Sequence, residues 1–174
     1  SLSDDVLRLN RRGHDVAAAR RAVRLLRQAG FKIHGHWMPN LYGSSVAADI
    51  ADYRRLFDDP DFRPDELKIY PSSLIESAEL MQRYRDGSWR PYSHDELVEV
   101  LLACFEHTPE YCRLTRVVRD IPGTDIVVGD LTTNFRQIVE RELEARGGRS
   151  EDIRSREIRG QRVASEALRL DEQW

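Results

Sequence analysis

The sequence predicts an α/β fold with a mostly parallel sheet and helices outside it. Segments whose apolar residues recur at three- and four-residue steps alternate with short apolar runs that are typical of strands. Each connection between successive predicted strands contains a predicted helix, and parallel strands need such a crossover. Three strands are predicted before the charged tail, too few to close a barrel. The chain is therefore either a piece of a larger α/β barrel or a small α/β domain that packs on another unit.

The elements follow from apolar periodicity, caps and turn residues. Asp15 is placed to cap the first helix and Gly30 to end it, while Ser93 and Glu96 have the spacing of a capping box. The predicted helices are 16–29, a segment from Ser44 or Ser45 to about residue 57, 75–85, 93–107 and 134–146. The predicted strands are 32–37, 67–71 and 111–118, with 152–158 (DIRSREI) as a further candidate strand, and residues 1–15 are predicted to be a loop.

Composition bounds the class of protein. The 174-residue chain is long enough for one domain with a sizeable core, and its 40% hydrophobic and 33% charged residues are typical of a soluble globular protein. No apolar run approaches the ~20 residues of a membrane span, and the first residues lack the features of a signal peptide. We therefore expect a cytoplasmic location and no membrane contact. The net charge of -3 provides no global basic field for nucleic acid.

Polar side chains follow the carboxyl ends of the three predicted strands, in HWMPNLYG, YPSSLIE and VVRDIPG. Ligand sites of parallel α/β sheets form at these ends, so we expect the side chains to meet at one rim. They are His36, Asn40, Tyr70, Ser72, Ser73, Arg119 and Asp120. Loops are polar in any case, and an ordinary solvated rim is the alternative.

Two further groups are candidates for ligand contact. His34 and His36 share one face of a strand, but no third ligand has a fitting spacing, so no metal site is predicted. Segment 10–15 (NRRGHD) has the glycine and basic residues of an anion-binding turn before a helix, with a plain helix-entry turn as the alternative. Cys104 and Cys112 are predicted to be ordinary buried thiols, because two cysteines alone build no metal site.

Arginines form two clusters that suit phosphate, because a guanidinium makes bidentate contacts. One cluster is Arg113, Arg116 and Arg119, and the other is Arg154, Arg156 and Arg159. Three-residue spacing lets at most two of the first cluster share a strand face. Arg119, at the carboxyl end, is the best phosphate contact, and Arg116 is second only if the strand bulges. Neighbouring carboxylates make a salt-bridged surface the alternative. The sequence contains no Walker, dinucleotide-binding, nucleophile-elbow or HExxH motif.

Four blocks together resemble one known family. They are LRLNRRGHDVAAARRAVRLLRQAGFKIHGHWMPNLYGS, RPDELKIYPSSLIESAELMQRYRDGSWRPYS, LTRVVRDIPGTDI and DIRSREI. They resemble consecutive blocks of the catalytic subunit of Elongator, the radical S-adenosylmethionine (SAM)/acetyltransferase family that modifies wobble uridines of tRNA. The resemblance covers nearly all of residues 4–160. RDIPG and DIRSREI are specific to this family, whereas the first block is shared with methylthiotransferases and oxygen-independent coproporphyrinogen oxidases.

The resemblance implies a fragment of a larger enzyme. The family has an N-terminal half-barrel with a cysteine triplet for a 4Fe–4S cluster and a C-terminal acetyltransferase domain that handles acetyl-CoA, and neither is present here. Residues 1–121 would be the second half of a radical SAM-type (β/α) barrel, and residues 122–174 the connector toward the acetyltransferase domain. The implied function is part of a tRNA U34 carboxymethylation/acetyltransferase enzyme that uses SAM and acetyl-CoA, with a homodimer or Elongator-type subunits as partners. We do not expect this fragment alone to be active.

Two alternatives stay open: a non-catalytic tRNA-binding module, or part of another radical SAM enzyme. The residues that the resemblance places on the SAM side are Arg12, His14, His36, Met38 and Tyr70. Those expected to contact tRNA are Lys68, Arg116, Arg119, Arg154 and Arg156. This chain has Ser72, Ser150 and Ser155 at positions where members of the family often have cysteine. The resemblance implies that the cysteines at positions 150 and 155 contribute to a zinc-type site in the connector, and serine is a poor zinc ligand. No metal ligand and no catalytic residue is therefore predicted.

Overall fold

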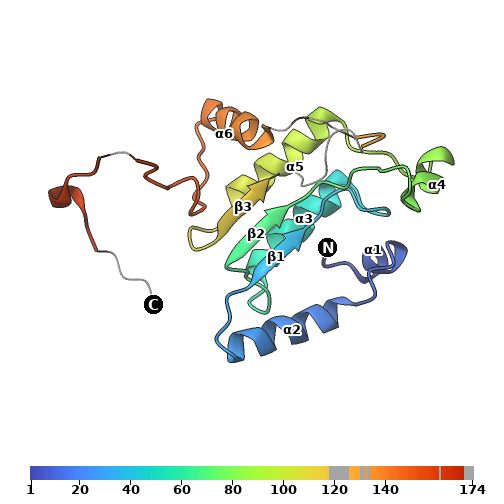
Figure 1. Cartoon of the computed structure of the whole chain (residues 1–174), viewed down its shortest axis with the longest axis horizontal. Coiled ribbons are helices and arrows are strands. Elements are labelled where there is room, and N and C mark those ends of the chain that lie inside the picture. The colour runs from blue at the N-terminus through green and yellow to red at the C-terminus, as the bar shows by residue number, and fades with distance from the viewer. Residues whose placement is uncertain (118–125, 130–131, 133, 161, 171–174) are drawn as a thin grey trace.

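Three strands form one parallel sheet at the centre of the molecule. The computed structural model describes residues 1–117, 126–129, 132, 134–160 and 162–170. The sheet consists of β1 (His34–Trp37), β2 (Glu66–Ile69) and β3 (Arg113–Val117), in the order β1-β2-β3 (Figure 1). Both neighbouring pairs are parallel, which confirms the predicted sheet type. The helices are α1 (Asp4–Leu9), α2 (Val16–Gln28), α3 (Val46–Asp58), α4 (Leu80–Arg85), α5 (His94–His107), α6 (Phe135–Ala145) and the 3-10 turn η2 (Ser165–Ala167).

The helix starts follow the caps that the sequence indicates. Asp15 accepts a hydrogen bond from the Ala18 N–H at 2.7 Å, and Ser45 plays the same part for α3. The capping box of α5 is complete, because Ser93 and Glu96 each bond the backbone N–H of the other. These local bonds satisfy N–H groups that a helix start leaves without partners. Among the described residues, no helix has the length and apolar character needed to cross a membrane.

One face of the sheet forms the main core. Gly35, Leu67 and Leu114 lie in register across the three strands, and Trp37, Ile69 and Val117 form the next such row. These rows pack against buried side chains of α3, α5 and α6, among them Tyr53, Val100, Leu101, Phe105, Phe135, Val139 and Leu143. Each fully buried side chain of this size stabilises the fold by about 1.5–3 kcal/mol. Helix α6 therefore shares one core with the sheet.

The N-terminal segment differs from the prediction. Residues 1–15 are not a loop throughout, because α1 lies within them. Ser3 caps its first turn through a bond from the Val6 N–H, and Asp4 and Asp5 suit the positive end of the helix dipole. Asn10 then donates to the Tyr42 carbonyl at 2.8 Å, which ties this segment to the loop after β1.

The helix before the capping box is shorter than predicted. The pattern indicates a helix over 75–85, but α4 begins only at Leu80. Upstream of it, Leu74 forms an antiparallel bridge with Val128, and residues after it make turns with three-residue steps. Turns thus take the place of the first predicted helical residues, directly after a pairing with a distant segment that local periodicity does not reveal.

Strand β3 contains an irregularity. Leu67 pairs with Leu114, but the next residue of β2, Lys68, pairs with Arg116. Thr115 is therefore an extra residue in β3, which is the definition of a β-bulge. The bulge brings Arg116 to the same face of the sheet as Arg113. Without a bulge, the three-residue spacing of the two arginines would place them on opposite faces.

Candidate functional site

The face of the sheet opposite the core carries polar side chains in two rows. The first row is His34, Glu66 and Arg113, and the second is His36, Lys68 and Arg116. The second row lies nearer the carboxyl ends of the strands. Parallel sheets are usually covered on both faces by apolar packing, so a polar face is unusual. We take this surface, called the open face below, as the candidate site.

The first row is held by its own contacts. His34 Nε2 lies 3.0 Å from the Thr115 hydroxyl, and His34 Nδ1 lies 3.4 Å from a Glu66 carboxylate oxygen. Arg113 forms an ion pair with Glu157 of the tail. Histidine and arginine in this row thus each lie beside a carboxylate.

The second row is cationic. Burial, followed by the charge of Lys68 and the neighbouring His34, lowers the pKa of His36 and so favours its neutral form. The His36 ring makes edge contacts with Tyr70, 5.6 Å between centroids, and with His34, 5.8 Å. Lys68 and Arg116 supply positive charge in register on adjacent strands. This arrangement attracts an anionic group and offers aromatic rings beside it.

The loops after β1 and β2 meet at one rim, as predicted for these two of the three strand ends. The Tyr70 N–H donates to the Trp37 carbonyl and the Ser72 N–H to the Pro39 carbonyl, both at 2.9 Å. The bridge of Leu74 with Val128 adds a third segment there. Ser72 and Ser73 are half-buried. Arg119 and Asp120 lie outside the described residues.

Asn40 belongs to the buried support of this rim. Its N–H donates to Asp49 Oδ2 at 2.6 Å, and Asp49 also accepts from Tyr92 and Ser44 at 2.8 and 2.5 Å. Trp89 Nε1 donates to the Asn40 carbonyl. Burial raises the pKa of Asp49 despite these donors. Asp49 was not predicted from the sequence, although a carboxylate beside Val46, Ile50 and Tyr53 on an apolar helix face indicates a buried polar residue that several groups contact.

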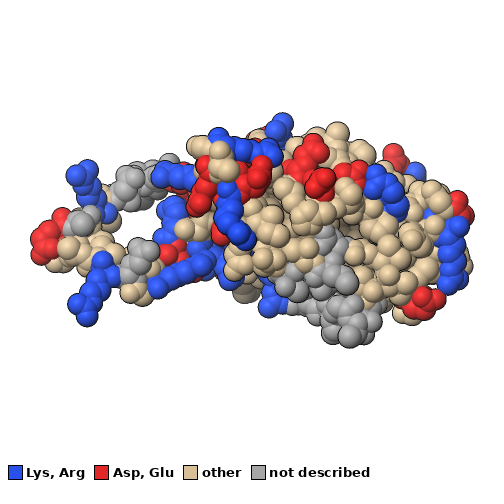
Figure 2. All heavy atoms as spheres, turned by 90° about the horizontal axis from the view of Figure 1, so that it is seen from above, with Lys and Arg blue, Asp and Glu red and all other residues tan. Residues whose placement is uncertain are grey.

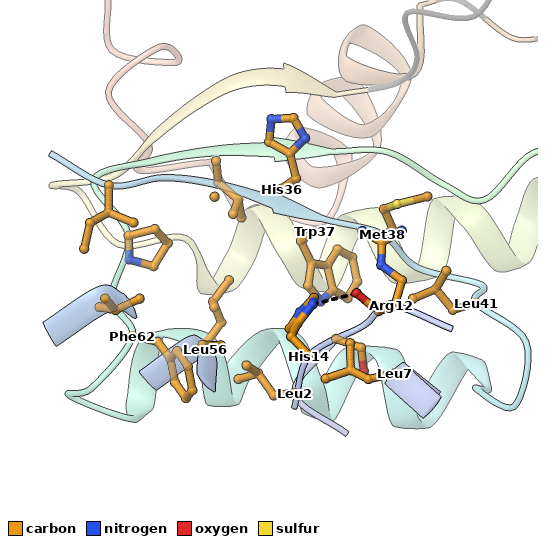
Figure 3. Close-up of a pocket in the computed structure, with 17 residues that line it drawn as sticks. Leu2, Leu7, Arg12, His14, His36, Trp37, Met38, Leu41, Leu56 and Phe62 are labelled. Carbon is orange, nitrogen blue, oxygen red and sulfur yellow. Dashed lines mark hydrogen bonds between the residues drawn. The ribbon is translucent and has the colours of Figure 1, made fainter. Parts of the chain in front are cut away.

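A second feature, a cavity of about 250 Å³, lies on the helix side of β1 (Figure 3). Arg12, His14 and Met38 line it, among mostly apolar side chains such as Leu7 and Phe62. His14 Nδ1 is 2.9 Å from the Arg12 carbonyl. Although His36 also borders the cavity, its ring points away from it, toward the open face (Figure 3).

The structure thus divides the predicted SAM-side residues between two places. Arg12, His14 and Met38 lie at the cavity, while His36 and Tyr70 lie at the open face.

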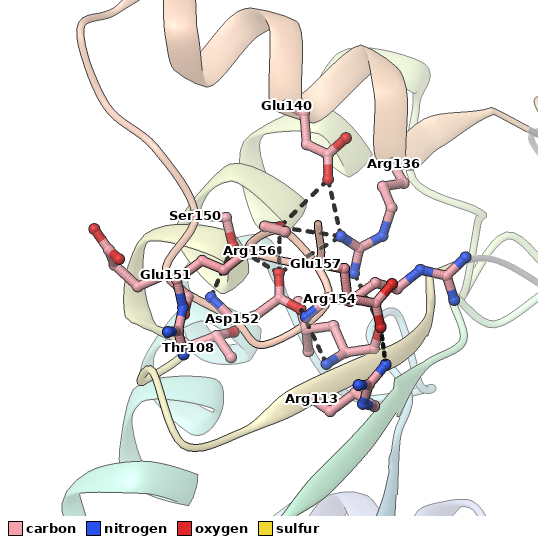
Figure 4. A network of polar contacts seen from close by, with 12 residues as sticks. Thr108, Arg113, Arg136, Glu140, Ser150, Glu151, Asp152, Arg154, Arg156 and Glu157 are labelled. Atoms are coloured by element: carbon pink, nitrogen blue, oxygen red, sulfur yellow. Dashed lines mark hydrogen bonds and ion pairs between the residues drawn. The ribbon is translucent and has the colours of Figure 1, made fainter. Parts of the chain in front are cut away.

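Residues 149–160 cover the outer edge of β3 (Figure 4). Segment 152–158 is not a strand, because its backbone makes turns with three-residue steps. It bonds the edge through one backbone donor, the Ile153 N–H to the Cys112 carbonyl, and otherwise through side chains. Arg154 donates to the Thr115 carbonyl at 2.7 Å, and Arg136 to the Leu114 carbonyl at 2.9 Å. An edge strand covered in this way has few free groups for further pairing.

Asp152 is the centre of this contact. The carboxylate is fully buried, and Ser150 and Ser155 both donate to its Oδ2, at 3.0 and 2.5 Å. Arg136 lies 3.5 Å from the same oxygen. Burial alone would raise the pKa of Asp152, but the bond from Ser155 and the Arg136 charge outweigh it and the pKa is lowered. We call Asp152, Ser150, Ser155 and Arg136 the Asp152 cluster.

The predicted tRNA contacts fall into three groups. Lys68 and Arg116 are neighbours on the open face. Arg154 and Arg156 are engaged with backbone carbonyls, of Thr115 and of Glu110 and Glu151 respectively. Arg119 lies outside the described residues. Figure 2 shows acidic and basic side chains interspersed over one face of the molecule, in keeping with a net charge of -3.

The residues present do not fit the zinc-type site that the resemblance implied for the connector. The hydroxyls of Ser150 and Ser155 already donate to Asp152, and Arg136 puts positive charge beside the same oxygen. In the described part of the chain, no three His, Cys, Asp or Glu side chains are arranged to hold a metal ion.

The two cysteines do not fit a cluster site either. Cys104 and Cys112 are fully buried free thiols, as predicted. Burial raises the pKa of both, to about 12 for Cys112, whereas metal ligation needs thiolates.

Comparison with known proteins first shows the class of fold to which the structure belongs. Residues 64–145 match the radical SAM C-terminal domain family. The structure resembles that of the archaeal Methanocaldococcus infernus Elp3 with N-terminus deletion (1–46), with a TM-score of 0.87 and 37% identity. The match covers 91% of this chain and 37% of that chain. The fold is therefore part of a radical SAM-type fold.

Curated relatives that are similar to the chain carry more specific names. The chain is 40% identical over 156 residues to the tRNA uridine(34) acetyltransferase of Dehalococcoides mccartyi, covering 90% of this chain and 34% of the relative. It is 34% identical over 158 residues to human Elongator complex protein 3, covering 91% and 29%. The chain spans about a third of the length of these relatives, and over that segment it is similar to them.

Proposed function

We propose that the chain is part of an Elongator-type enzyme that modifies uridine 34 of tRNA. In this proposal, residues 1–121 supply the second half of the radical SAM barrel and residues 122–174 the connector toward an acetyltransferase domain. The observation that carries the proposal is the open face. It places a cationic row beside aromatic rings at the carboxyl ends of parallel strands, where α/β enzymes bind ligands. The names and similarity of the relatives support the same function.

The complete enzyme would use SAM with a 4Fe–4S cluster, and acetyl-CoA as co-substrate. Bound SAM would supply the radical, while this chain would bind and orient its substrates. Arg12, His14 and Met38 are the proposed contacts at the cavity, and His36 and Tyr70 those at the open face. Elongator-type subunits or a second copy are proposed partners, and a cytoplasmic location stays a prediction.

The proposed tRNA contacts are Lys68 and Arg116 first, because they lie together on the open face. Arg119 stays a prediction. Arg154 and Arg156 are proposed in a supporting role at the outer edge of β3, where their guanidinium groups bind carbonyls. Lys68→Gln or Arg116→Gln should weaken tRNA binding uniformly over tRNA sequences and lower the salt slope by about one. Arg24→Gln, an exposed cation on α2, is the matched control and should change neither.

A chimera tests the enzyme function. This chain replaces the matching segment of the Dehalococcoides mccartyi tRNA uridine(34) acetyltransferase, to which it is 40% identical. We expect modified uridine 34 in tRNA, measured by mass spectrometry of nucleosides. A chimera that folds and binds tRNA like its parent but produces no modified uridine would contradict the proposal and favour the non-catalytic tRNA-binding alternative.

A further inference from the structure

The bulge in β3 decides where Arg116 lies. In a regular strand, side chains alternate between faces, so residues 113 and 116 would point to opposite faces. The extra residue Thr115 shifts this alternation, and Arg116 therefore lies in register with Lys68. Removal of the bulge would turn Arg116 toward the apolar face, beside α5.

The Asp152 cluster and its neighbour Arg154 contact the backbone at this bulge. Asp152 Oδ1 accepts from the Leu114 N–H at 3.3 Å, and Arg136 donates to the Leu114 carbonyl. Arg154 donates to the Thr115 carbonyl. From the other side, the Thr115 hydroxyl donates to the Leu67 carbonyl at 3.2 Å. The two residues at which the register shifts are thus held from the outer edge by three side chains.

We propose that the Asp152 cluster is a positioning element: it holds the bulge at Thr115 and thereby keeps Arg116 beside Lys68 on the open face. The cluster acts without a metal ion, through hydrogen bonds and the buried Asp152–Arg136 pair. The expected effect of the cluster on RNA binding rests on the proposed function. Its expected effect on the backbone of β3 does not. Asp152 and Ser155 act through Arg116 and do not contact RNA.

The test is a cycle of variants in the full chain. Asp152→Asn, Arg116→Gln and the double variant are compared for tRNA affinity over a range of salt concentrations. In the parent background, Asp152→Asn should weaken binding several-fold and lower the salt slope by about one. In the Arg116→Gln background it should have no further effect. Glu142→Gln, at an exposed ion pair on the same helix as Arg136, is the control and should change neither.

Hydrogen exchange provides a second readout that is independent of RNA. Asp152→Asn should speed exchange of the Thr115 and Arg116 amides at least tenfold relative to β1, and Glu142→Gln should not. If Asp152→Asn does not fold, Ser155→Ala removes one bond to the same carboxylate and should give the same pattern with a smaller effect. Unchanged exchange at β3 would overturn the proposal.

The outcomes separate this proposal from the proposed function. Equal loss of tRNA affinity in both backgrounds would show that Asp152 acts independently of Arg116 and would overturn the positioning role. If Arg116→Gln has no effect on tRNA binding, the RNA role of the open face is wrong, and the exchange measurement alone decides whether the cluster holds the bulge.

Discussion

Single buried polar residues shape the rim of the candidate site. Asp49 connects the loop after β1 to the segment before α5, because it accepts from Asn40, Ser44 and Tyr92. Asn40 has a φ of 63°, a left-handed conformation that this contact helps to maintain. One carboxylate therefore fixes the path of the chain immediately after the strand that carries His36.

Asp49→Asn should destabilise the protein by about 1–3 kcal/mol, because an amide nitrogen cannot accept the bonds that one carboxylate oxygen now accepts. Urea denaturation measures the change. Asp58→Asn, at an exposed position of the same helix, is the control and should stay within about 0.5 kcal/mol. Equal stability of Asp49→Asn and the parent would show that the three bonds contribute nothing net.

The contacts of Glu96 predict that the stability of the folded protein depends on pH. Bonds from Arg90 and from the Ser93 N–H lower its pKa to about 2, compared with 4.5 for an ordinary glutamate. Because the folded-state pKa lies below the unfolded one, the stabilisation is complete above about pH 4.5 and is lost as the pH falls toward 2. Glu96→Gln removes the charge, so the difference in urea midpoint between parent and variant should shrink over this range. A difference that is independent of pH would argue against the ion pair as its source.

At the scale of elements, sequence patterns predict the helices and strands that caps and apolar periodicity determine. The caps of α2, α3 and α5, the apolar faces of their helices and the three strands could all be predicted from the sequence. Segment 152–158 could not, because its contacts with the edge of β3 favour turns over a strand. The start of α4 could not, because turns follow the pairing of Leu74 with the distant Val128. The polar character of the open face could be predicted in part, from His34 and His36. The bulge that places Arg116 on this face could not be predicted, because it depends on contacts distant in sequence.

Segment 149–160 should be independent of metal. The donors around Asp152 are hydroxyl and guanidinium groups, so a chelator removes none of them. We expect the Ile153 amide to keep its protection from hydrogen exchange, and the melting temperature to stay constant, when EDTA is added to the purified chain. Stoichiometric zinc in the chain, together with a lower melting temperature after chelation, would contradict this.

At the scale of the whole molecule, α6 and the sheet share one core even though the predicted boundary near residue 121 places them in different units. Leu143 and Val139 of α6 are buried in the same cluster as Leu101 and Leu114. A helix that packs in this way does not unfold separately from the sheet it covers.

Leu143→Ala should therefore lower the stability of the whole described core by about 2–5 kcal/mol. Far-ultraviolet circular dichroism and tryptophan fluorescence should report the same shift in midpoint, because Trp37 lies in the same core. Leu168→Ala, at a side chain that is 66% exposed, is the control. Separate transitions by the two methods would show that α6 is an independent unit.

The strands lie in the sheet in the order in which they occur in the chain. During synthesis, β2 and β3 can therefore each pair with a neighbour that has already left the ribosome. Asp152, Ser155 and Arg154 are made after all three strands, so the backbone at Thr115 lacks its outer contacts until they emerge. We expect a nascent chain that ends before residue 150 to have a formed sheet in which Arg116 has not yet reached its final position.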